Sequence, residues 1–206
     1  MGVFGTRGRM AYSQLFASLF GSDRKVRDIM AVDLSAALTR IPDYPEPGII
    51  FVDLTSLMQD ADALKAAVDG IADHFAGKGI TKVVGAEARG FIIGTPVAYK
   101  LGAGFVPARK PGKLPRETFS QSYELEYGTD SLEIHKDALT ADDAVLIVDD
   151  LVATGGTAVA QKELVEKAGA KVAGFAFITE LEYLHPRELI AKATDAEVFS
   201  LVQETK

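Results

Sequence analysis

Residues 145–157 read VLIVDDLVATGGT, and this stretch decides the fold. Its apolar start, with Ala144 before it, predicts a strand over 144–148 that is buried on both faces of a parallel sheet. Asp149 and Asp150 follow at the carboxyl end of that strand, and a turn rich in Gly and Thr leads into a helix predicted over Thr157–Lys167. Ligands of open α/β sheets bind at this end of the strands, so we expect a binding site here.

Predicted helices and strands alternate on both sides of this stretch. Helical spacing is found over Asp33–Arg40, Asp60–Phe75 and Phe91–Leu101, and strands are predicted over Lys82–Gly85, Gly104–Arg109, Val172–Thr179 and Glu197–Val202. Tyr123–Tyr127 and Leu132–His135 predict an antiparallel hairpin. The alternation predicts an α/β fold with a mostly parallel central sheet flanked by helices.

The turn after the aspartates has the chemistry of a phosphate cradle. Gly155 and Gly156 allow successive backbone N–H groups to point into one concavity, and the start of the helix adds a partial positive charge. Ala153–Thr157 are therefore predicted to hold a phosphate, whereas Asp149 and Asp150 suit sugar hydroxyls or a Mg²⁺ that sugar and phosphate hold. The alternative is a capped helix with surface aspartates.

Composition excludes several classes of chemistry. The 206 residues predict one domain at roughly 150 residues per domain. The absence of cysteine excludes disulfides, thiol catalysis and cysteine-ligated metals, and three histidines without ligand-like spacing make a histidine-rich metal site a poor fit. The net charge of −7 disfavours nonspecific nucleic-acid binding, and no uncharged run approaches the ~20 residues of a membrane helix.

The charge is uneven along the chain. Residues 1–30 hold five cations and two acids, hence +3, and can be an appendage or, if Met30 is the natural start, an upstream extension. Residues 109–116, RKPGKLPR, hold four cations and no acid. Pro and Gly make this segment a loop, either a solvated surface loop or an anion-binding lid.

Residues 145–157 resemble the phosphoribosyl pyrophosphate (PRPP) signature of type I phosphoribosyltransferases. Further stretches resemble the adenine phosphoribosyltransferase family: YPEPGIIFVD at 44–53, EARGF at 87–91, and RKPGKLP at 109–115 with LEYG at 125–128. The resemblance implies a type I phosphoribosyltransferase fold with a small hood and a flexible catalytic loop. It implies a catalytic domain over 31–206 and leaves 1–30 as an N-terminal extension of unknown role.

The resemblance also implies the reaction and the roles of residues. The reaction would be adenine + PRPP → AMP + pyrophosphate, a step of purine salvage, with Mg²⁺ bound through PRPP. The enzyme would be a cytoplasmic homodimer with no nucleic-acid or membrane partner. Catalysis is implied for Glu126, Arg89 and Lys113. The 5′-phosphate would be bound by Ala153, Thr154, Gly155, Gly156 and Thr157, and the ribose by Asp149 and Asp150. Pyrophosphate would be bound by Arg89, Lys110 and Lys113. Adenine would be bound by Ile50, Phe51 and Leu151, and Tyr127 would lie in the closing loop. The family also has a cis peptide at the position of Glu87–Ala88.

One position departs from the family, and two other functions stay open. Many relatives have Arg where this chain has Val52, so another group would have to steady the base. A phosphoribosyltransferase for a 6-oxopurine such as xanthine or hypoxanthine is the first alternative. A PRPP-sensing regulator, with residues 1–30 as its only candidate for a nucleic-acid-binding module, is the second.

Overall fold

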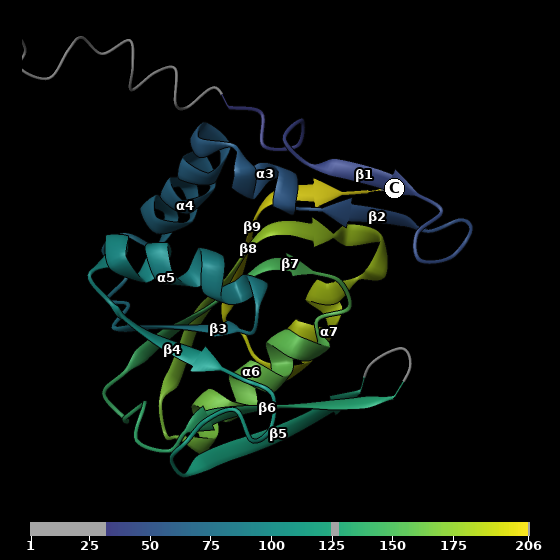
Figure 1. The fold of residues 1–206 in the computed structure, drawn as a ribbon. Coiled ribbons are helices and arrows are strands. Elements are labelled where there is room, and N and C mark those ends of the chain that lie inside the picture. Colours follow the sequence, from purple (N-terminus) through teal and green to yellow (C-terminus); the bar gives the residue numbers. More distant parts are fainter. Residues whose placement is uncertain (1–31, 125–127, 206) are drawn as a thin grey trace, which may run out of the picture. The chain divides into compact units, whose positions relative to one another are not determined.

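The computed structural model describes residues 32–124 and 128–205. The predicted extension at residues 1–30 lies outside these ranges. Leu34–Lys206 form one compact unit, and the described part of that unit is shown in Figure 1. None of the helices in this part is long and apolar enough to cross a membrane.

A five-stranded parallel sheet is the centre of the unit. Its strand order is β4-β3-β7-β8-β9, and every neighbouring pair is parallel. The strands are β3 (Lys82–Ala86), β4 (Gly104–Ala108), β7 (Ala144–Val152), β8 (Lys171–Leu181) and β9 (Glu197–Glu204). The sequence prediction of an α/β fold with a mostly parallel sheet is confirmed.

Helices cover both faces of this sheet (Figure 1). The helices α4 (Ala61–Phe75) and α5 (Arg89–Leu101) lie on one face, and α6 (Gly156–Lys167) and α7 (Pro186–Ala193) lie on the other. Two short helices, α3 (Thr55–Gln59) and η1 (Glu182–Leu184), connect neighbouring elements. The predicted start of α4 is confirmed, because the Asp60 side chain accepts hydrogen bonds from the first turn of the helix.

Two small antiparallel sheets flank the central one. The pair β5 (Thr118–Glu124) and β6 (Thr129–His135) forms an antiparallel hairpin at the predicted place, but both strands start earlier than predicted, and residues 125–127 of the predicted first strand lie outside the described residues. The other pair is β1 (Thr39–Pro42) and β2 (Ile50–Asp53). The helix predicted over Asp33–Arg40 is wrong: residues 34–37 form turns and β1 starts at Thr39. Pairing with β2 satisfies the β1 backbone, and residues 43–48 turn the chain back from β1 into β2.

The strand β7 is longer than its apolar run predicts. Val145–Val148 are fully buried, yet the strand continues to Val152 because Asp149 pairs with Phe177 and Leu151 pairs with Thr179 of β8. The long neighbouring strand therefore extends β7 beyond its apolar segment. Both aspartates consequently lie on the sheet rather than in the loop that follows it.

Candidate active site

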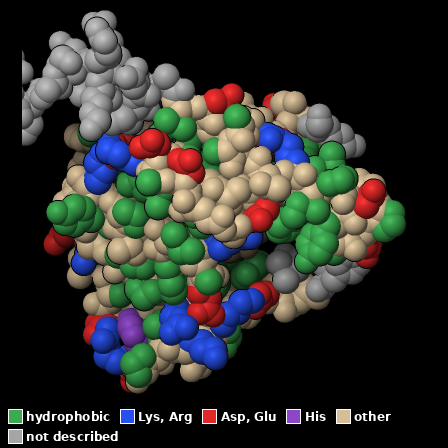
Figure 2. Space-filling view, turned by 45° about the horizontal axis from the view of Figure 1, so that its top comes forward, with side chains coloured by type: hydrophobic (Ala, Val, Ile, Leu, Met, Phe, Trp, Pro, Cys, Tyr) green, Lys and Arg blue, Asp and Glu red, His purple; other side chains and the backbone are tan. Residues whose placement is uncertain are grey.

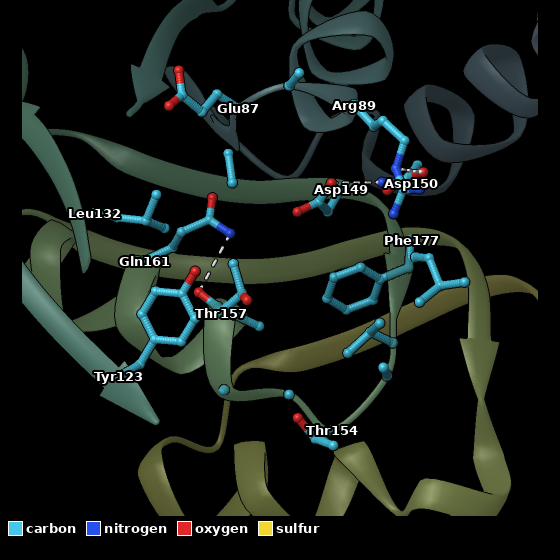
Figure 3. Close-up of a pocket in the computed structure, with 18 of the residues that line it drawn as sticks. Glu87, Arg89, Tyr123, Leu132, Asp149, Asp150, Thr154, Thr157, Gln161 and Phe177 are labelled. Atoms are coloured by element: carbon cyan, nitrogen blue, oxygen red, sulfur yellow. Dashed lines mark hydrogen bonds and ion pairs between the residues drawn. The ribbon is translucent and has the colours of Figure 1, made fainter. Parts of the chain in front are cut away.

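A cavity of about 310 Å³ opens at the carboxyl ends of β3 and β7 (Figure 3). It gathers residues from three segments that the sequence pattern singled out separately. The predicted site residues that line it are Arg89, Lys110, Asp149, Asp150, Leu151, Ala153, Thr154, Gly155, Gly156 and Thr157.

The turn between β7 and α6 depends on a left-handed glycine. Gly155 has φ +91° and is the residue that precedes the first turn of α6. A Cβ atom at this position would lie 3.0 Å from the carbonyl oxygen of Pro186, the first residue of α7. Both the backbone conformation and the close approach of α7 therefore require glycine here. The result is a tight turn that aims the amino end of α6 at the cavity.

Asp149 and Asp150 are unlike ordinary surface aspartates. Burial, together with the neighbouring Asp150 carboxylate, raises the pKa of Asp149 well above its ordinary value of 3.8. Burial also raises the pKa of Asp150, although the Arg89 guanidinium opposes this shift. Arg89 Nε lies 2.7 Å from Asp150 Oδ2, in an ion pair whose carboxylate is only 2% exposed. Two adjacent carboxyl groups with raised pKa values in one cavity are typical of functional sites.

The turn between β3 and α5 approaches the aspartates closely. The Glu87–Ala88 peptide bond is cis, as the family resemblance implies. A Cβ atom on Gly90 would lie 3.0 Å from Asp149 Oδ1, so a larger residue would push this turn away from the carboxylate. The absence of a side chain at Gly90 therefore lets the start of α5 lie against the end of β7.

Three of the four cations of residues 109–116, Arg109, Lys110 and Arg116, form ion pairs with acids. Glu87 accepts hydrogen bonds from Arg109 Nε at 2.8 Å and from the Lys110 backbone N–H at 2.9 Å. Lys110 Nζ forms an ion pair with Asp130, and this pairing raises the pKa of Lys110. The loop is thus anchored at its start by Glu87, and its first lysine is held charged beside the cavity.

Other predicted site residues lie elsewhere. Lys113, Ile50 and Phe51 do not line this cavity. Ile50 lines a second cavity, Phe51 packs edge-on against Tyr44 with ring centroids 5.2 Å apart, and the Lys113 carbonyl accepts a hydrogen bond from Arg109. The predictions for Glu126 and Tyr127 fall outside the described residues.

The residues that line the cavity but were not predicted from the sequence include Tyr123, Leu132, Gln161 and Phe177. A helical periodicity argument could have found Gln161, because it lies one turn after Thr157 on α6. Leu132 and Phe177 belong to strands whose register only the fold determines. Burial raises the pKa of Tyr123, whose hydroxyl also lies within 3.4 Å of Asp130.

Charges of both signs lie on the face of the molecule shown in Figure 2. On the face shown in Figure 2, Lys and Arg side chains lie next to Asp and Glu side chains instead of forming one broad basic patch. Within the described part of the chain, no group of three or more His, Asp or Glu side chains could hold a metal ion. A carboxylate pair such as Asp149–Asp150 fits a Mg²⁺ whose remaining ligands come from a bound phosphate and sugar.

Comparison with protein families agrees with this architecture. Residues 54–203 match the family model described as a phosphoribosyl transferase domain. The matched region begins just after β2 and includes the central sheet up to the last residue of β9, the residues that line the cavity and the loop of residues 109–116. The fold is therefore that of a type I phosphoribosyltransferase.

Individual relatives narrow the class further. The chain is 53% identical to the adenine phosphoribosyltransferase of Koribacter versatilis over 84% of this chain and 93% of that protein. The crystal structure of adenine phosphoribosyltransferase from Thermoanaerobacter pseudethanolicus matches with a TM-score of 0.78 and 46% identity, over 84% of this chain and 98% of the other. The Saccharomyces cerevisiae enzyme, in complex with adenine and an imino-altritol bisphosphate, matches with a TM-score of 0.76 and 40% identity, over 82% and 96%. The chain belongs to the adenine phosphoribosyltransferase family.

Proposed function

We propose that this enzyme transfers the phosphoribosyl group of PRPP to N9 of adenine, giving AMP and pyrophosphate. The observation that carries the proposal is the single cavity that joins a left-handed glycine turn at the start of α6, two buried aspartates and two cations. PRPP is a ribose with a phosphate at one end and a pyrophosphate at the other. A site for it needs a turn that binds the phosphate, carboxylates that bind the ribose hydroxyls and cations that bind the pyrophosphate. The relatives described above support adenine as the base.

The 5′-phosphate fits the turn of Ala153–Thr157. Backbone N–H groups at the start of a helix and the hydroxyls of Thr154 and Thr157 are donors that suit an anion. The carboxyl groups of Asp149 and Asp150 would then accept hydrogen bonds from the ribose hydroxyls. Because burial disfavours their ionised forms, donation from two hydroxyls would stabilise these carboxylates.

Pyrophosphate would be received by Arg89, Lys110 and Lys113. In the structure Arg89 and Lys110 are paired with Asp150 and Asp130. Binding of pyrophosphate would exchange these carboxylate partners for phosphate oxygens, so the loop would be released from its acids as it engages the substrate. Positive charge at the leaving group stabilises the transition state, since pyrophosphate gains charge as the bond to the anomeric carbon breaks.

The base would lie between Phe51 and Leu151, with the Ile50 backbone recognising its edge. Leu151 lines the cavity, whereas Phe51 belongs to β2, so the purine would bridge the β1–β2 sheet and the end of β7. Glu126 would manage the proton of the imidazole edge, a contribution of ~10²–10⁴-fold for general acid–base catalysis. Tyr127 would help to close the loop over the ribose.

Mg²⁺ would be held mainly by PRPP, with Asp149 and Asp150 as the protein carboxylates within reach. When bound, it would neutralise part of the pyrophosphate charge. We also propose the remaining properties implied by the resemblance: a catalytic domain over 31–206 with 1–30 as an extension, a homodimer, and a cytoplasmic location.

Product identification tests the proposal. Purified protein would be incubated with PRPP, Mg²⁺ and adenine, hypoxanthine or xanthine in turn, and the nucleotides separated by chromatography. We expect AMP from adenine and at least a hundredfold less product from either 6-oxopurine, because the two kinds of base present opposite hydrogen-bonding groups. Turnover of xanthine or hypoxanthine without AMP formation would favour the 6-oxopurine alternative. DNA binding that needs residues 1–30 and responds to PRPP would favour the regulator.

A further inference from the structure

The β1–β2 sheet is connected to the central sheet by a polar contact rather than by strand pairing. β1 and β2 pair with each other, and neither belongs to the five-stranded sheet. Adjacent residues of a strand point to opposite faces, so Ile50 and Val52 face one side of β2 and Phe51 faces the other. The face with Ile50 and Val52 lies over a cavity of about 390 Å³.

That second cavity separates the β1–β2 sheet from the end of the central sheet. It is lined by Ile50 and Val52 of β2, by Tyr183 and Leu184 of η1, and by Arg40 and Glu204. A hollow of this size means that side chains of the two sheets do not fill the space between them. Dispersion contacts are lost across such a gap, so apolar packing holds the β1–β2 sheet weakly on this side.

An ion pair spans the gap. Arg40 Nε donates to Glu204 Oε2 at 3.0 Å, and a terminal nitrogen of the same guanidinium donates to Glu204 Oε1. This two-point geometry fixes orientation as well as distance. Arg40 also donates to the Ser35 carbonyl at 3.1 Å and to Ser35 Oγ at 2.8 Å. Figure 1 shows where the pair acts: β1 and β2 lie beside the C-terminal end of β9, which carries Glu204.

The strand register places Arg40 where its effect on the base site is direct. Arg40 pairs with Val52 across the β1–β2 sheet, so their side chains share the face that lies over the cavity. Ile50 lies on that same face, and Phe51 is the residue between Ile50 and Val52. A shift of Arg40 would therefore move the backbone of Ile50 and the ring of Phe51 together.

We propose that Arg40 is a positioning residue for the base: by holding Glu204, it fixes the β1–β2 sheet so that Ile50 and Phe51 meet adenine at the right place. This inference rests on the proposed function. The groups proposed for PRPP lie at the end of β7, in the turn and first residues of α6, at the start of α5 and in the loop of residues 109–116, and none of these segments carries Arg40 or Glu204. Loss of the Arg40–Glu204 pair should therefore affect adenine and PRPP differently.

Steady-state kinetics of Arg40→Ala, Arg40→Lys and Glu204→Gln tests the inference. We expect Arg40→Ala and Glu204→Gln to raise KM for adenine roughly tenfold, which is less than the ~10²-fold that a misplacement of about 1 Å can cost, with KM for PRPP within about twofold. The KM for adenine of Arg40→Lys should be intermediate, because the lysine ammonium can keep one of the two contacts with Glu204. The double variant should be no worse than either single one, since both remove the same interaction.

Glu197→Gln is the matched control. Glu197 lies at the other end of β9 and pairs with His74 and Lys78 of the α4 region, away from β1 and β2. It should leave both KM values unchanged. Amide hydrogen exchange gives a readout independent of turnover: Ile50–Asp53 should exchange faster in Arg40→Ala than in the wild type, with the β7 amides unchanged.

Two kinds of failure can be told apart. Wild-type enzyme that makes no AMP would overturn the proposed function and, with it, this inference. Normal wild-type turnover with an unchanged KM for adenine in Arg40→Ala would overturn the inference alone. Equal increases of KM for adenine and PRPP, or unchanged exchange at Ile50–Asp53, would also overturn it.

Discussion

Replacing Gly155 by alanine is the most local way to perturb the proposed phosphate site. The substitution adds one methyl group and changes no charge. At φ +91° an alanine is disfavoured by about 1–2 kcal/mol relative to glycine. Its Cβ would also lie 3.0 Å from the Pro186 carbonyl oxygen and 3.5 Å from Ile190 Cγ1, so the turn would have to move away from α7. Such a movement redirects the donors at the start of α6.

The expected size of the effect follows from that strain. If 1–2 kcal/mol is lost from phosphate binding, kcat/KM for PRPP should fall by about 5–30-fold, since 1.4 kcal/mol corresponds to a factor of ten. Gly169→Ala is the control. Gly169 ends the same helix with a similar φ of +84°, but a Cβ there would have no neighbour within 4 Å. The Gly169→Ala substitution should lower the free energy of unfolding by about 1–2 kcal/mol and leave kcat/KM for PRPP unchanged.

Two measurements on both variants decide the matter. Urea unfolding gives the stability change, and initial rates at varied PRPP with saturating adenine give kcat/KM. A Gly155→Ala enzyme with wild-type kcat/KM for PRPP would refute the assignment of this turn to the 5′-phosphate. A comparable kinetic loss in Gly169→Ala would show that general destabilisation, and not the turn itself, explains the effect.

Three further predictions concern the charged groups. Asp149→Asn should cut turnover sharply, and an unchanged turnover would contradict the ribose role. The same variant should raise the melting temperature at neutral pH, because the folded protein binds the Asp149 proton more tightly than the unfolded chain does, and the stabilisation from that proton, present below pH 3.8, is lost as pH rises through the raised pKa of Asp149. The gain in melting temperature should therefore vanish in acid. Asp130→Asn frees Lys110 from its acid partner, so inhibition by pyrophosphate should strengthen by about 2–5-fold in product-inhibition assays, and weaker inhibition would count against partner exchange. Glu126→Gln should lower kcat more than it weakens PRPP binding, measured by rates and by equilibrium titration, and the reverse order would assign Glu126 to PRPP binding rather than to proton transfer.

The sequence predicted the centre of the fold and the core of the site. The buried run before Asp149 identified β7, and the glycines and threonines that follow identified the turn, because both features are local and depend on neighbouring residues. The cavity indeed contains the ten predicted residues from Arg89 to Thr157 named above. Local chemistry was sufficient where the functional groups are consecutive in the chain.

The rest depends on contacts between distant segments. Asp33–Arg40 has helical spacing, but pairing with β2 makes its end a strand, and tertiary structure overrides such weak preferences. The Arg40–Glu204 and Arg89–Asp150 pairs join residues 164 and 61 positions apart, which no local pattern reveals. The loop of residues 109–116 has only cations of its own, and its acid partners Glu87 and Asp130 come from other elements.

We propose above that one cavity holds the phosphoribosyl group between the turn that precedes α6 and two aspartates. A crystal structure of the enzyme with AMP tests it most directly. We expect the 5′-phosphate within hydrogen-bond distance of backbone N–H groups of Ala153–Thr157, the ribose hydroxyls on Asp149 and Asp150, and the purine between Phe51 and Leu151. A phosphate bound instead by Lys110 and Lys113, with the turn before α6 empty, would contradict the account.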